Sequence, residues 1–128
     1  MLSILENNEF CKKCGRCCIN TEMILTVEDI QRLASLGYRV EDYAEYRDGY
    51  LRLRNIDGHC IFYDPASGLC RVYKYRPIGC RLYPIVFYVD FEGVTVDEYC
   101  PQSHLITKED LRKALKLRDR ILRGLIKA

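Results

Sequence analysis

The sequence predicts a small α+β domain of irregular shape that is stabilised by bound metal. Three observations lead to this class. The chain has 128 residues, of which 48% are hydrophobic and 30% charged, which suits one globular domain with a modest core. Its apolar pattern changes between the spacing of short helices and that of short strands. It also contains eight cysteines. We therefore expect a single domain over residues 1–128.

The first regular element that we expect is a short helix in the N-terminal half. Thr26 is a favourable cap residue, and the acidic Asp29 follows three positions later. Gly37 supplies a stop signal. Between them, apolar residues recur at helical spacing: Ile30, Leu33 and Leu36.

The next segment favours a second short helix that runs through Tyr43 and Tyr46 and ends near Gly49. Residues 51–54 then alternate apolar and basic side chains, as a half-buried strand does. Short β-hairpins should follow. Asp57-Gly58 is a turn signal, and residues 61–63 are typical of a strand that enters the loop 64–68. These hairpins would present Cys60 and Cys70.

The clearest hairpin signal lies further along the chain. Residues 84–89 and 94–96 are rich in β-branched and aromatic side chains, and they flank the turn 90–93. Thr107 and Asp110 then form a second capping signature, which predicts a C-terminal amphipathic helix over about residues 107–127. We expect this helix to pack on its own domain with a solvated basic face, with a partner contact as the alternative.

The cysteines are arranged as metal ligands. Four of the eight fall within eight residues, and the others stand alone: Cys11, Cys14, Cys17 and Cys18, then Cys60, Cys70, Cys80 and Cys100. A thiolate at every third position lets one tight loop direct several sulfurs at a single point, as in zinc and iron-sulfur sites. The first ten residues have no basic segment followed by an apolar run, so we expect no signal peptide. The protein is therefore predicted to be cytoplasmic, where thiols stay reduced.

The number of sites stays open at the sequence level. Eight cysteines could form two sets of four, with the adjacent Cys17 and Cys18 directed at different sites. They could also form a single four-ligand site with the other cysteines buried or free. The dense run favours an iron-sulfur cluster, of the 4Fe-4S type, and zinc is the alternative. His59 and His104 are weak ligand candidates, because loop histidines are more often simply exposed.

These residues resemble a known family. The run Cys11-x2-Cys14-x2-Cys17-Cys18 is followed by Cys60-Ile61-Phe62 and by Cys70-x2-Tyr73-x2-Arg76-Pro77-x2-Cys80-Arg81-x-Tyr83-Pro84. This order is similar to that of the CxxCxxCC cysteine-cluster family, also called YkgJ-like. The resemblance implies chelation of zinc or iron, usually expected as an iron-sulfur cluster, by Cys11, Cys14, Cys17, Cys18, Cys60, Cys70 and Cys80. Flagellin lysine N-methylases resemble the same module but are longer, so their chemistry is not carried over.

Two arginines beside the later cysteines are expected to assist the bound cofactor. A guanidinium close to thiolate sulfur donates hydrogen bonds and positive charge, and it raises the reduction potential of a cluster. Arg76 and Arg81 are the candidates. An ordinary ion pair with an acidic residue is the alternative for each.

The function classes follow from these residues. An iron-sulfur protein with a redox, electron-transfer or accessory role is favoured, and it implies a protein or redox partner that the sequence does not name. A zinc-stabilised interaction module is the alternative. Motifs for nucleotide binding, Ser-His-Asp catalysis or zinc proteolysis are absent from the sequence, which disfavours a standalone enzyme and leaves the catalytic residues unknown. Nucleic-acid binding is disfavoured, since the basic residues can balance thiolate charge, and no apolar run is long enough to span a membrane.

Overall fold

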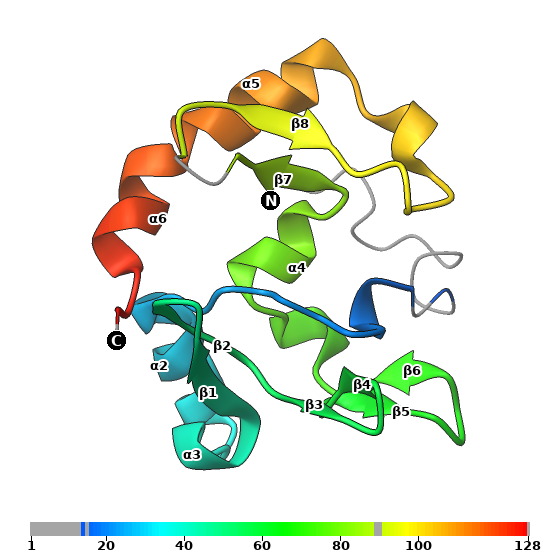
Figure 1. Ribbon diagram of the computed structural model, residues 1–128, viewed down its shortest axis with the longest axis vertical. Helices are drawn as coiled ribbons and strands as arrows, with labels where there is room; N and C mark the ends of the chain where they lie inside the picture. Colours follow the sequence, from blue (N-terminus) through cyan, green and yellow to red (C-terminus); the bar gives the residue numbers. More distant parts are fainter. Residues whose placement is uncertain (1–13, 15, 89–90, 128) are drawn as a thin grey trace.

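The computed structural model describes residues 14, 16–88 and 91–127 (Figure 1). They form a mixed α+β domain, as predicted, built from short helices and two-stranded antiparallel hairpins. The helices are α2 (Val27–Ser35), α3 (Val40–Tyr43), α4 (Ile78–Leu82), α5 (Lys108–Lys116) and α6 (Arg118–Gly124). Single 3-10 turns are η1 (Arg16–Cys18), η2 (Tyr73–Tyr75) and η3 (Ser103–Leu105).

The helix α2 has the capping box that the sequence predicts. The Thr26 hydroxyl accepts from the Asp29 amide at 3.3 Å, and the Asp29 carboxylate accepts from the Thr26 amide at 2.9 Å. This exchange satisfies two backbone donors that a helix start leaves without partners. At the other end Gly37 has a φ of +93°, a conformation that glycine adopts without a steric penalty.

The segment after α2 corrects one sequence prediction. The helix α3 ends at Tyr43, and residues that were expected to continue it form the strand β1 (Ala44–Arg47). This strand pairs with β2 (Tyr50–Leu53) in register Ala44 to Leu53 and Arg47 to Tyr50. Asp48 and Gly49 both have positive φ and form a tight turn. The hairpin therefore outcompetes the weak helical pattern because it buries Ala44, Leu51 and Leu53.

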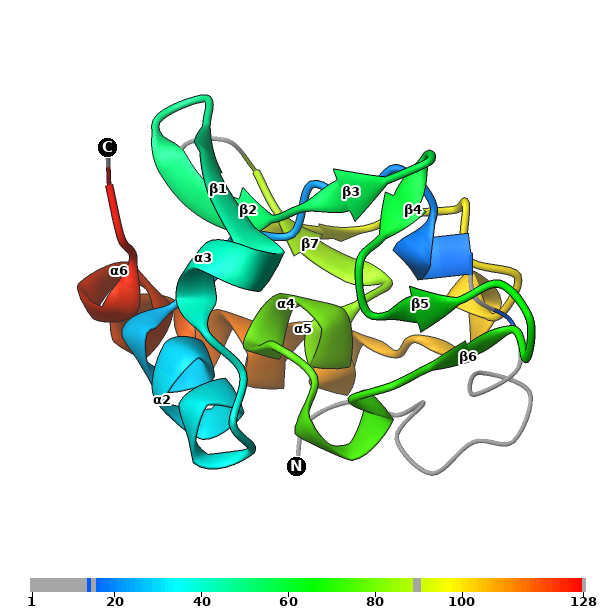
Figure 2. The same ribbon diagram turned by 90° about the horizontal axis from the view of Figure 1, so that it is seen from below.

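Two smaller hairpins present cysteines, as predicted. In the first, β3 (Asn55–Ile56) pairs with β4 (His59–Cys60). In the second, β5 (Tyr63–Asp64) pairs with β6 (Leu69–Cys70). The strand predicted at residues 61–63 is instead divided, since Ile61 and Phe62 form the turn between the two hairpins. The turn η1 lies beside β4 through a bridge between Ile19 and His59 (Figures 1 and 2).

The C-terminal part contains the predicted hairpin and a divided helix. The hairpin pairs β7 (Ile85–Phe87) with β8 (Val94–Val96). The expected single helix is wrong in one respect, because it breaks at Leu117 into α5 and α6 and ends at Gly124. Residues after Gly124 are extended and form bridges from Leu125 to Thr26 and from Lys127 to Tyr50. Because the chain becomes extended after Gly124, its last residues can pair with the backbone at the start of α2 and in β2.

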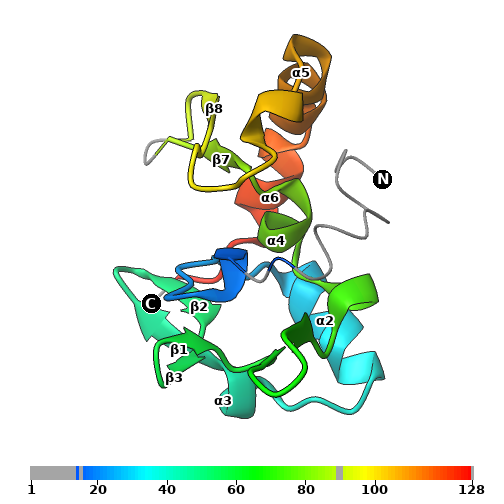
Figure 3. The same ribbon diagram turned by 90° about the vertical axis from the view of Figure 1, so that its right-hand side faces the viewer.

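Two hydrophobic cores meet at the helix α4. The first core is centred on Leu25, Leu33, Tyr43 and Leu53, with the cysteines of the hairpins at its edge. The second lies between the β7–β8 hairpin, α5 and α6. Figure 3 shows α4 between these two parts of the molecule. Within α4, Leu82 belongs to the second core, whereas Cys80 packs against the first.

No helix in the described part of the chain combines the length and the apolar character that crossing a bilayer requires.

A substitution in the first core tests this packing. Leu33 is fully buried, so Leu33→Ala should lower the free energy of unfolding by about 2–5 kcal/mol, because it removes apolar contacts and leaves a cavity. Leu36→Ala is the matched control at the end of the same helix, where the side chain is 40% exposed, and it should cost about 0.5 kcal/mol or less. Urea unfolding followed by circular dichroism measures both. Equal losses would contradict the placement of α2.

Candidate metal centre

Five cysteines from four separate elements gather at the edge of the first core. The turn η1 carries Cys17 and Cys18, β4 carries Cys60, β6 carries Cys70 and α4 carries Cys80. Cys18, Cys70 and Cys80 pack against the core that contains Cys60. Cys17 interacts electrostatically with Cys60, Cys70 and Cys80. Segments that are more than 60 residues apart in sequence thus deliver thiols to one region.

The sulfurs of Cys17, Cys18 and Cys70 are linked by hydrogen bonds. The Cys18 thiol lies between the other two and bonds to both, which raises the pKa of Cys18 strongly. The same contact is the main reason that the pKa of Cys17 falls to about 7, with a further contribution from the charge of Arg76. It also lowers the pKa of Cys70. The adjacent Cys17 and Cys18 therefore interact with each other and with neighbouring thiols of the same group.

Of the other two cysteines, Cys60 is buried and Cys80 is half-buried. Burial raises the pKa of Cys60 to about 11, and nearby thiols add to the effect. Burial also raises the pKa of Cys80 well above its usual range, again with contributions from neighbouring cysteines. A buried thiol stays protonated unless a cation compensates the thiolate charge.

Arg76 supplies a buried positive charge at this cluster. The residue is 5% exposed, and its charge helps to lower the pKa values of Cys17 and Cys70 and partly opposes the rise in the pKa of Cys80. The guanidinium donates to the carbonyls of Tyr73 at 2.9 Å and Cys80 at 3.4 Å, and it lies 4.0 Å from the centroid of the Tyr73 ring. None of the ion pairs among the described residues includes Arg76. The thiols are therefore the groups beside Arg76 that could become negatively charged.

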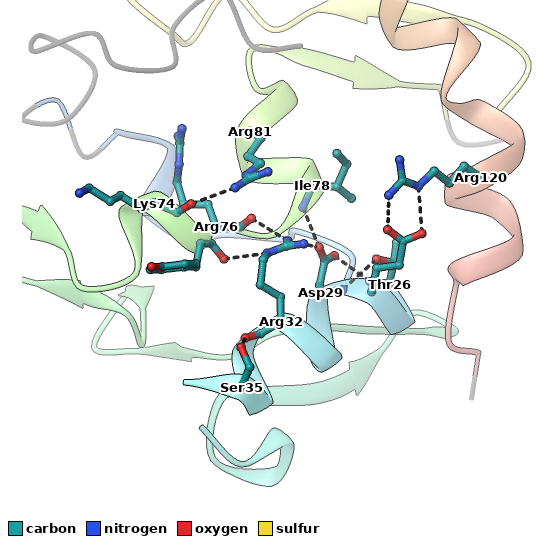
Figure 4. A network of polar contacts seen from close by, with 11 residues as sticks. Thr26, Asp29, Arg32, Ser35, Lys74, Arg76, Ile78, Arg81 and Arg120 are labelled. Atoms are coloured by element: carbon teal, nitrogen blue, oxygen red, sulfur yellow. Dashed lines mark hydrogen bonds and ion pairs between the residues drawn. The ribbon is translucent and has the colours of Figure 1, made fainter. Parts of the chain in front are cut away.

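Arg81 occupies a different position. It is half-buried on α4 and donates to the carbonyl of Lys74 at 2.8 Å, so it braces the turn η2 against α4 (Figure 4). The two arginines that the sequence singles out thus differ in their described contacts. Arg76 acts electrostatically on three thiols, and Arg81 bonds to the backbone that precedes Arg76.

A buried carboxylate on α2 positions the segment that carries Arg76 and Cys80. Asp29 is fully buried, and its carboxylate accepts from the Ile78 amide at 2.9 Å and from Arg32 at 2.7 Å. Arg32 also donates to the carbonyls of Arg76 at 2.9 Å and Tyr75 at 3.4 Å (Figure 4). The Ile78 amide lies at the start of α4, where a helix supplies no backbone acceptor for it and the N-cap residue makes no side-chain hydrogen bond. Asp29 therefore caps α4 as well as α2.

Three further cysteines complete the predicted ligand set. Cys11 is not among the described residues, and Cys14 is half-buried before η1. Cys100 is buried after β8, on the side of Tyr83. Tyr83 donates to Asp97 at 2.7 Å, and burial, this bond and the charges of Cys17 and Cys100 all raise its pKa.

The two histidines take other roles. The Nδ1 atom of His59 lies 2.9 Å from the Cys60 carbonyl oxygen, and its ring packs edge-on against Tyr63. His104 is exposed in η3. Within residues 14, 16–88 and 91–127, no three Cys, His, Asp or Glu side chains are gathered closely enough to hold a metal ion in the described conformation.

Sequence reasoning missed the residues that support the cluster. Asp29 was identified only as a local helix cap, and Arg32 was not singled out. The bonds that join them to residues 75–78 span more than 40 positions. The cation–ring contact between Arg76 and Tyr73 and the Tyr83–Asp97 bond were likewise not foreseen. The spacing Tyr73-x2-Arg76 was a usable signal, because it places the ring and the guanidinium one turn apart.

The fold and the gathered thiols define a small cysteine-rich α+β domain. A family model named CxxCxxCC and described as a "Putative zinc- or iron-chelating domain" matches residues 10–101. The chain therefore belongs to this family, and metal binding is the activity that membership supports. The similarity to flagellin lysine N-methylases stays a prediction.

One relative is an uncharacterized protein, MJ0661, from Methanocaldococcus jannaschii. It is 35% identical over 82 residues, which cover 58% of this chain and 43% of the relative. The match thus spans less than half of the length of that protein. No solved structure matches the chain.

The thiol environment predicts an order of chemical reactivity in the metal-free protein. At pH 8 iodoacetamide should modify Cys17 first, because its lowered pKa makes it largely thiolate, and Cys60 more than tenfold more slowly, since its pKa is near 11. Peptide mass spectrometry over a time course measures both rates in one sample. Equal rates at Cys17 and Cys60 would show that the cluster lacks the described hydrogen bonds.

Proposed function

We propose that this chain is an iron-sulfur protein with one thiolate centre, whose ligands come from Cys17, Cys18, Cys60, Cys70 and Cys80. The proposed cofactor is a cluster of the 4Fe-4S type, and the proposed role is redox, electron-transfer or accessory. The observation that carries the proposal is the buried Arg76 beside three thiols, without a carboxylate partner in the described part of the chain. A buried cation needs a compensating anion.

The chemistry of the donor set suits such a group, although the described thiols would have to move closer together to bind it. Thiolate sulfur is the preferred donor for iron-sulfur clusters, and a cluster of this type takes four cysteines. Five candidate thiols therefore suffice for one centre. When bound, the cluster would supply a one-electron redox couple. Cys11 and Cys14 belong to the same sequence run as η1 and stay candidate ligands, as does Cys100, which interacts with Tyr83 as Cys17 does.

The protein residues would contribute by orientation and charge. Arg76 would hold thiolates in their charged form and favour the reduced state of a cluster, since reduction adds negative charge beside a guanidinium. Cys60 and Cys80 would close the centre on its buried side. The hydrogen-bonded Cys17, Cys18 and Cys70 would exchange their shared proton for metal, so binding should release protons.

Zinc is the second candidate, and the packing of the thiols against the first core supports it. A closed four-thiolate zinc site joins segments that are distant in sequence and contributes folding free energy. In that case the domain would act as an interaction module. In either case we propose a cytoplasmic protein with an unidentified protein or redox partner, since free thiols in this number need a reducing compartment.

Metal and sulfide analysis of matched cysteine variants tests the proposal. Full-length protein purified without oxygen should be brown and contain iron and acid-labile sulfide in equal amounts. Cys80→Ser should lose most of both, because Cys80 is one of the five thiols, whereas Ala114→Ser, which places the same hydroxyl in the second core, should retain them.

Three outcomes are decisive. Colourless protein that holds only zinc would reject the cluster and support the second candidate. Equal loss of iron from Cys80→Ser and Ala114→Ser would reject a single centre built on the five thiols. Absence of any bound metal would reject both functions.

A further inference from the structure

The C-terminal segment lies beyond the family match, yet it docks on the helix that positions the thiol cluster. The family match ends at residue 101, and α6 follows at Arg118–Gly124. Arg120 forms a two-pronged ion pair with Glu28 of α2, with Nε donating to Oε1 at 2.9 Å and the second guanidinium nitrogen donating to Oε2 (Figure 4). The pair joins residues 92 positions apart.

Backbone contacts continue this docking after α6. Leu125 bridges to Thr26, the N-cap of α2, and Lys127 bridges to Tyr50. The Leu51 amide donates to the carbonyl of Ile126 at 2.9 Å. Gly124 approaches α2 so closely that a Cβ atom there would lie 3.1 Å from the Cβ of Thr26. The C-terminal segment therefore holds the first turn of α2 by side-chain and main-chain contacts.

The same turn of α2 holds the cluster segment on its other side. Glu28 meets Arg120, and the next residue, Asp29, accepts from the Ile78 amide. Arg32, one turn later, donates to the Arg76 carbonyl. Because a helical turn is rigid, displacing it at Glu28 also displaces the acceptor of Ile78. Two docking surfaces, one for α6 and one for residues 75–78, thus share a few residues of α2.

We propose that Glu28 and Arg120 are positioning residues for the metal centre. Docking of α6 on α2 holds Asp29 and Arg32 in position. These two residues in turn hold the segment that carries Arg76 and Cys80. The docked α6 therefore slows the release of metal. Coupling between two sites is reciprocal, so bound metal should also protect α6 against opening. This inference rests on the proposed function, in that a metal must be bound.

Charge reversal in the full-length protein tests the inference. The variants are Glu28→Arg, Arg120→Glu and the double exchange, each reconstituted with ferrous iron and sulfide without oxygen, or loaded with zinc if only zinc is retained. The control is Arg112→Glu, which makes the same charge change on α5, where Arg112 pairs with Glu109 of its own helix. Transfer of metal to an excess of a strong chelator gives the release rate.

Each single reversal should speed metal release by about two- to fivefold, the range expected for an exposed ion pair, and the double exchange should restore it to within about twofold. Arg112→Glu should leave the rate nearly unchanged. Equal release from Arg120→Glu and Arg112→Glu, or no recovery in the double exchange, would overturn the inference.

Hydrogen exchange provides a second measurement. If the ion pair between Glu28 and Arg120 acted only locally, metal binding would not change the exchange of α6. Loading the unmodified chain with metal should slow amide exchange in residues 120–124, far along the sequence from every cysteine of the cluster, and Arg120→Glu should reduce this protection. Identical exchange with and without metal would also overturn the inference. A chain that binds no metal would instead reject the proposed function, so the two failures are distinguishable.

Discussion

The buried carboxylate of Asp29 is the interaction on which the rest of the structure depends. It is fully removed from solvent and accepts from Thr26, Arg32 and Ile78, which belong to the start of α2, to α2 itself and to the start of α4. Removing one partner of a buried charge costs about 3–5 kcal/mol, so these donors are held in place together. The position of α4 against α2 follows, and with it the positions of Arg76 and Cys80.

The charge of Arg76 is the second feature that organises the thiol cluster. Arg76 is buried beside Cys17, Cys70 and Cys80, and its backbone carbonyl accepts from Arg32. Hydrogen bonds from a neighbouring thiol and the charge of a nearby cation make it easier for a thiol to lose its proton. The structure thus places anion-forming groups, a buried cation and a rigid support in one region, which agrees with membership of a family described as chelating zinc or iron.

Local signals in the sequence predicted local structure well. The capping boxes at Thr26 and Thr107, the β7–β8 hairpin and the hairpins that carry Cys60 and Cys70 are confirmed, because each depends on residues close in sequence. The helix expected through Tyr46 is wrong, since hairpin pairing and burial of Leu51 and Leu53 override a weak helical pattern. The break at Leu117 and the second role of Asp29 depend on contacts across the chain, which no local pattern encodes. The cysteine run indicated a metal site, but only the fold could show that Cys17 and Cys18 face the same thiols.

The most direct test measures the effect of the Arg76 charge on the reduction potential of the proposed iron-sulfur cluster. Arg76→Gln removes the charge, Arg76→Lys retains it, and Arg71→Gln removes an exposed guanidinium that pairs with Asp64 instead. In anaerobic redox titrations Arg76→Gln should lower the reduction potential by on the order of 60 mV, a tenfold change for a one-electron couple, while the other two variants stay close to the unmodified protein. A potential that is the same in Arg76→Gln and Arg71→Gln would contradict the claim that the five thiols and Arg76 form one metal centre.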